Sequence, residues 1–272
     1  MNQEALEEMS PRSTWCDKLA ATPAIGFKFD YHYASSAALL DALAPVLDKL
    51  VDAEKAKFAL AEKAKFTLNR QDSFAVEFTT EDGFHYGVDA SRVWVEFQHR
   101  MKVKPTSGGP PVAELLSRPA PFTELLPQVS ERLLNATEAI LAVHKRMLVR
   151  VGVVASTFVT EKELPPGIAR FIQYLGRPWR NPLAQYSVQL TADLDKNRDW
   201  LDRASHTLIK SGDEEDPLTL RFDWSRTFST DRPADGSILK SVVSEVTQAS
   251  MQYFEELAEG NRFDEEIIRS DS

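Results

Sequence analysis

Hydrophobic and polar residues follow two periodicities along this chain, and their order in the first half begins with a strand. Aromatic residues at every second position predict a half-buried strand over Phe27–Tyr33. A helix with one apolar face follows, capped by Ser35 or Ser36. Four short alternating runs then predict a meander of hairpins over Lys65–Arg70, Ser73–Thr79, Phe84–Val88 and Arg92–Gln98.

The second half repeats this order after a loop and a long helix. Residues 103–121 are rich in Pro and Gly and predict a loop or linker, and a long amphipathic helix is expected from Thr123 to His144. The elements expected next are a strand, a short helix, three strands and a long helix, at Met147–Ser156, Leu164–Leu175, Tyr186–Leu194, Ser205–Lys210, Leu218–Trp224 and Ile238–Leu257.

This order predicts an α+β protein in which a strand–helix–antiparallel meander–long helix unit occurs twice. The two units are expected to form one curved sheet against long helices, although their sequences show no literal repeat. We expect an N-terminal segment over residues 1–24, a first half over 25–146, a second half over 147–260 and a flexible tail over 261–272.

Alternation along the strands also predicts which side chains face away from the long helices. That face is expected to carry Ala75, Glu77, Thr79, Arg92, Trp94, Glu96, Gln98, Gln185, Ser187, Gln189, Thr191, Arg221 and Asp223. A broad polar face with one tryptophan is typical of a docking surface, and we take Arg92 and Trp94 as candidate partner-binding residues. The alternative is a face that is only solvated.

A second candidate surface is the segment 170–182, where a predicted helix end runs into a proline-restrained loop. Arginines and large aromatic residues dominate the binding energy of many protein interfaces. The candidates here are Arg170, Tyr174, Arg177, Trp179 and Arg180. In the alternative interpretation, Trp179 fills a gap in the core and the arginines are solvated.

The charge balance disfavours nucleic acid as a partner. The chain has 32 Lys and Arg against 41 Asp and Glu, a net charge of −9, and neither half has a basic excess. A nucleic-acid-associated function would depend on two basic clusters, Lys55, Lys57, Lys63, Lys65, Arg70 and Lys145, Arg146, Arg150.

No known catalytic or ligand-binding motif stands out, so we expect no catalytic residues, metal or cofactor. Dinucleotide and phosphate-loop glycine patterns and the nucleophile elbow are missing, and the five histidines lack metal-ligand spacing. The single cysteine, the acidic N-terminus and the lack of a long apolar run predict a cytoplasmic protein that does not enter a membrane.

Two resemblances concern architecture. The repeated unit resembles the saddle of the TATA-binding protein, which implies a fold but no DNA binding for an acidic chain. The central stretch Arg150-Val151-Gly152, followed by Phe158, is similar to a mid-chain stretch in a sporadically distributed bacterial family of uncharacterised proteins about as long as this chain. That resemblance implies no activity and no functional residues.

The function that these observations favour is that of a non-enzymatic protein-binding or scaffold module of the bacterial cytoplasm. The first alternative is a small-molecule sensor or an enzyme with a pocket between the sheet and a long helix. The second is a nucleic-acid-associated protein. The identity of the partner and the oligomeric state stay open.

Overall fold

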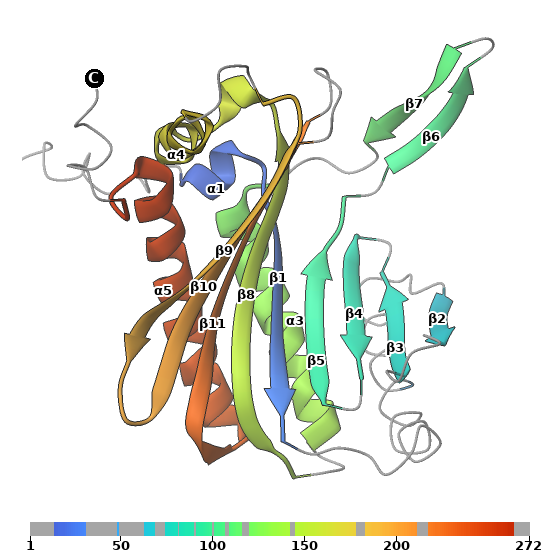
Figure 1. The fold of residues 1–272 in the computed structure, drawn as a ribbon. Coiled ribbons are helices and arrows are strands. Elements are labelled where there is room, and N and C mark those ends of the chain that lie inside the picture. The colour runs from blue at the N-terminus through green and yellow to red at the C-terminus, as the bar shows by residue number, and fades with distance from the viewer. Residues whose placement is uncertain are drawn as a thin grey trace, which may run out of the picture.

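The fold is α+β and is built on one large antiparallel sheet, which confirms the predicted fold class (Figure 1). A computed structural model of the chain describes residues 14–30, 48, 63–68, 74–80, 82–89, 91–99, 101–106, 109–115, 120–141, 145–177, 183–210 and 217–263. The sheet has nine strands in the order β2-β3-β4-β5-β1-β8-β11-β10-β9. The strands are β1 Thr22–Phe29, β2 Lys63–Leu68, β3 Phe74–Thr79, β4 Phe84–Val88, β5 Arg92–Phe97, β8 Met147–Val159, β9 Tyr186–Lys196, β10 Trp200–Lys210 and β11 Leu218–Pro233.

The two halves place their strands in the same relative order. In each half the first strand pairs with the last strand of the following meander, so β1 pairs with β5 and β8 pairs with β11. The two first strands also pair with each other at the centre of the sheet, where Phe27 lies opposite Val151 and Gly26 opposite Gly152. In the second half the helix α4 (Pro166–Gly176) follows the first strand. The corresponding helix expected after Ser35 or Ser36 lies outside the described residues.

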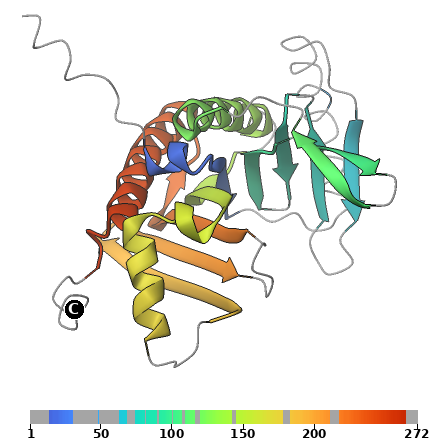
Figure 2. The same cartoon turned by 90° about the horizontal axis from the view of Figure 1, so that it is seen from above.

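Two long helices cover one face of the sheet. The helix α3 (Phe122–Leu141) packs on β1 and β5, and α5 (Gly236–Glu259) packs on β8 and β11. The short helix α1 (Trp15–Lys18) contacts both of them, and a 3-10 turn, η3 (Glu161–Glu163), precedes α4. Figure 2 shows that α3 and α5 lie on the outer side of the bend in the sheet, so the uncovered face is concave. None of the described helices is long and apolar enough to span a bilayer.

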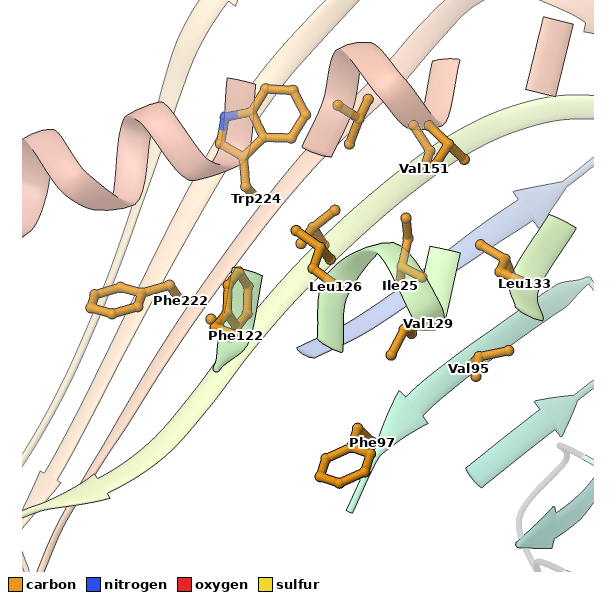
Figure 3. Close-up of a cluster of buried hydrophobic side chains, with 14 of the residues drawn as sticks. Ile25, Val95, Phe97, Phe122, Leu126, Val129, Leu133, Val151, Phe222 and Trp224 are labelled. Carbon is orange, nitrogen blue, oxygen red and sulfur yellow. The ribbon is translucent and has the colours of Figure 1, made fainter. Parts of the chain in front are cut away.

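The core lies between this helical layer and the sheet (Figure 3). Strand residues that alternate toward the helices, such as Ile25 and Val95, meet Val129 and Leu133 of α3. Trp224 and Phe222 of β11 belong to the same cluster. These side chains are 0–2% exposed, and those on the strands all point to the helical face of the sheet. Burial of this apolar surface holds the helices to the sheet.

The prediction of a loop over residues 103–121 is wrong for the first part of this range. A two-stranded hairpin forms there from β6 (Met101–Thr106) and β7 (Gly109–Leu115), and it projects from the main sheet (Figure 1). The Pro and Gly residues that predicted a loop are compatible with a hairpin outside a larger sheet, because its outer edges need no ladder hydrogen bonds.

The first strand starts earlier than predicted, within the expected N-terminal segment. It begins at Thr22 and ends at Phe29, because Pro23, Ile25 and Phe27 already alternate toward the core. Gly26 and Pro23 hide this alternation in the sequence, since both residues usually mark turns. The strands β10 and β11 also begin or end beyond the predicted limits, at Trp200 and Pro233.

Candidate functional site

Three cations lie side by side across the middle of the concave face. We call the uncovered face of the sheet the open face, and the predicted alternation places Arg92, Trp94 and Glu96 of β5 on it. Lys28 of β1 lies directly opposite Arg92 on one side and Arg150 of β8 on the other. All three are exposed, and directly paired residues of antiparallel strands have Cα atoms about 4.5–5.5 Å apart. We call Arg92, Lys28 and Arg150 the cation row.

A hollow of about 370 Å³ lies beside the cation row, over the centre of the sheet. Its floor is formed where Gly26 and Gly152 pair, because neither residue has a side chain to fill the space. The indole of Trp94 leans the other way and lies on Gly87 of β4, where an added Cβ atom would be only 2.0 Å from the ring. The glycines at 26, 87 and 152 therefore shape this central hollow and fix Trp94 at its wall.

The charges around the central hollow are partly paired. Arg92 Nε is 2.5 Å from Oδ2 of Asp89, and the Arg150 guanidinium donates to Ser225 Oγ at 2.9 Å. Asp223 lies 3.9 Å from Arg150 and 4.0 Å from Arg221. Lys28 makes no ion pair with any residue that the structure describes.

The central hollow continues into a second hollow toward the other end of the strands. The second hollow has a volume of about 540 Å³ and shares Ala24, Glu96, Val154 and Arg221 with the first. It also includes Phe158, whose side chain is 71% exposed. Together the two hollows form a groove across the open face, with cations at one end and an exposed aromatic ring at the other.

The described candidates of the 170–182 segment, Arg170, Tyr174 and Arg177, do not join this groove. The helix α4 packs against α5, on the helical side of the sheet. Arg170 donates from Nη2 to the carbonyl of Glu259 at 2.9 Å and so caps the end of α5 beside Gly260. Tyr174 is 40% exposed, with the guanidinium carbon of Arg177 5.6 Å from its ring centre. Trp179 and Arg180 lie outside the described residues.

The basic cluster Lys145, Arg146, Arg150 is not a single patch. Arg146 is only 3% exposed, with its guanidinium carbon 5.6 Å from the ring centre of Phe29 on the helical side, whereas Arg150 is on the open face. In the other cluster, only the backbone of Lys63 and Lys65 is described, in β2, and Lys55, Lys57 and Arg70 lie outside the described residues.

No group of metal-binding side chains is present among the residues whose positions the structure gives. His206 of β10 lies on the helical side of the sheet, where its ring stacks on Tyr253 with 5.5 Å between the ring centres. The Nε2 atom of His206 is hydrogen-bonded to the hydroxyl oxygen of Tyr253, 2.9 Å away. Burial lowers the pKa of His206 to about 4.

We expect the free energy of unfolding to fall by about 2–3 kcal/mol between pH 6.5 and pH 4 because of His206. In this interval the unfolded chain binds a proton at this residue and the folded chain does not, so acid favours unfolding. Urea titrations of the wild type and of His206→Gln at several pH values isolate the effect, since the carboxylates contribute equally to both proteins. An unchanged pH profile in the variant would contradict this prediction.

The comparisons with known proteins add no relative. No family model matches the chain, and no curated protein matches it either. The resemblance to a sporadically distributed bacterial family therefore stays a prediction.

Sequence reasoning identified Arg92 and Trp94 on the open face but missed two of their neighbours. Lys28 lies within the predicted strand Phe27–Tyr33 but was not selected as a candidate, and Arg150 was considered only as part of a basic cluster. Their polar positions in alternating strands were a usable signal for the face. The pairing register that aligns both with Arg92 is not encoded locally in any of the three strands.

Proposed function

We propose that this chain is a non-enzymatic binding module that recognises another protein through its open face, and that an acidic segment of that protein lies on the cation row. The single observation that supports the proposal is the row itself. Like charges directly opposite each other on neighbouring strands destabilise a sheet. Lys28 stands between two arginines without a carboxylate partner among the described residues, and an acidic ligand would relieve this repulsion.

The surroundings of the cation row suit a protein segment. The groove extends from Lys28 to Phe158 and is lined by both polar and apolar side chains, as interfaces commonly are. Trp94 and Arg92 belong to the residue types that contribute most binding energy in such interfaces. None of the described helices lies over this face (Figure 2), so the described part of the chain leaves the groove accessible to an extended segment.

The net charge of −9 does not oppose this proposal at physiological salt. The screening length is then about 8 Å, so a bound carboxylate interacts mainly with the groups around it. Those groups are the cations of the row, together with Arg221, while Asp89 and Asp223 are already engaged by arginines. Glu96, a further carboxylate that lines the groove, lies four residues along β5 from Arg92 and outside the cation row.

We expect a fluorescein-labelled oligoglutamate peptide to bind the protein, with an affinity that falls as salt is added. In Lys28→Ala/Arg150→Ala the affinity should fall by about 30-fold, equivalent to roughly 2 kcal/mol, because two of the three cations are lost. Fluorescence anisotropy measures both affinities. An oligoglutamine peptide of the same length should not bind.

The matched control is Lys240→Ala/Arg177→Ala, which removes the same number of charges from exposed positions, one in α5 and one directly after α4. Its affinity should stay within about twofold of the wild type, since neither residue lies on the open face. Equal losses of affinity in the two variants would contradict a specific site on the open face. A larger loss of affinity in the control would indicate that the peptide binds near α4. Free glutamate binding as tightly as the peptide would favour the small-molecule alternative.

A further inference from the structure

The outermost strand of the second half, β9, presents a long free edge. It has 11 residues and pairs with β10 along one side, and no described residue pairs with its other side. Most of its side chains are exposed on both faces. The outward amide and carbonyl groups of such a strand form a template for another strand.

Only one end of β9 is protected in the ways that natural edges usually are. Asp193, Asp195 and Lys196 place charges near its C-terminal end, and a register irregularity opposite Leu201 and Arg203 disturbs the ladder there. The stretch Tyr186–Ala192 has no charge, no proline and no glycine. By contrast, the sequence of the opposite edge strand, β2, contains Lys63 and Lys65 within six residues.

The unprotected stretch is complementary to itself. In an antiparallel pair centred on Gln189, Val188 lies opposite Leu190 of the second copy and Ser187 lies opposite Thr191. Tyr186 meets Ala192 at the ends, so apolar residues meet on one face and polar residues on the other. Leu190 is 43% exposed and would be covered by this pairing.

We propose that two copies of this chain associate through β9, in an antiparallel pair centred on Gln189 that joins their nine-stranded sheets. Antiparallel pairing of identical strands has twofold symmetry, so it produces a closed dimer. Uncharged cross-strand pairs carry no repulsion, whereas a pairing centred nearer the C-terminal end would bring the aspartates together. The inference is independent of what binds to the open face.

Sedimentation velocity over a series of protein concentrations tests the association. The wild type should approach twice its chain mass of 30.6 kDa as concentration rises. Gln189→Lys places two ammonium groups opposite each other at the twofold axis, so it should sediment as a monomer. Gln248→Lys, the same change at an exposed position of α5, should dimerise like the wild type. A wild type that stays at 30.6 kDa at every attainable concentration overturns the proposal.

Engineered cysteines test the register. Gln189→Cys should form a disulfide-linked dimer on oxidation, because the two Cα atoms are then about 5 Å apart. Thr191→Cys alone should not form this disulfide, since its two Cα atoms are about 13 Å apart along the strands. A mixture of Thr191→Cys and Ser187→Cys proteins should form it, because these two positions lie opposite each other in the proposed pair. The native Cys16 is 1% exposed and does not compete. A dimer in which Gln189→Cys fails to cross-link uses another surface, and the proposal is then wrong.

Discussion

Replacing Arg226 with methionine should lower the free energy of unfolding by about 3–5 kcal/mol. The Arg226 side chain is 10% exposed and pairs across β11 and β10 with Asp202, which is 5% exposed. Nε and Nη2 each donate to Asp202 at 2.8 Å, and Nη1 donates to Glu245 of α5 at 3.0 Å. The guanidinium carbon also lies 4.4 Å from the ring centre of Trp200. The variant leaves a buried carboxylate without its cation, which is the main source of the loss.

The double variant Arg226→Met/Asp202→Leu separates charge from packing. It removes both buried charges, so most of the lost stability should return. Glu245→Gln should cost less than about 1 kcal/mol, because the Glu245 side chain is 53% exposed. Urea titrations followed by circular dichroism measure all three free energies. If the single and double variants lose equal stability, the uncompensated carboxylate is not the cause.

Replacing Trp224 with alanine should cost a similar amount, about 3–5 kcal/mol. Trp224 is the largest fully buried side chain among the described residues, and it lies in β11 between Val153 and Ala204 of the neighbouring strands. Figure 3 shows its indole directed toward the helical layer. Truncation removes the buried ring and leaves a cavity that the surrounding strands and α5 fill only in part.

The matched control is Trp94→Ala, which removes the same side chain from the open face. Trp94 lies on Gly87 and is half-buried, so its loss should cost about 1 kcal/mol of stability while the affinity for an acidic peptide falls. Thermal unfolding and anisotropy give the two measurements. Equal destabilisation by the two substitutions would assign Trp94 a structural role in place of a binding role.

The α+β class could be predicted because apolar residues recur with a different period in strands than in helices. Alternation at Phe27 and Phe29, and again at Val151 and Val153, marks the two first strands, and a period of 3.6 marks α3 and α5. The same alternation places Arg92 and Trp94 on the face away from the helices. Alternation failed at Pro23 and Gly26, where small or turn-forming residues occupy strand positions.

Only part of the candidate site could be predicted from the sequence, because a site on a sheet depends on how the strands are paired. Arg92, Lys28 and Arg150 come from three strands separated by more than fifty residues along the chain, and only the register brings them into one row. Arg170 shows the opposite case. It stands beside aromatic residues in the sequence, but tertiary packing directs it to the end of α5, where it caps the carbonyl of Glu259.

Apart from the hairpin of β6 and β7, the sequence by itself determined the types of the main strands and long helices, their order, their repetition and the polarity of the strand faces, since these follow from local side-chain patterns. The tertiary structure alone decided the strand order across the sheet, the cation row, the central hollow and the free edge of β9. Hydrogen bonds between backbones are the same for every residue pair, so register and neighbour choice depend on the packing of the whole core. That packing sets β1 beside β8 at the centre of the sheet and leaves β9 at its edge.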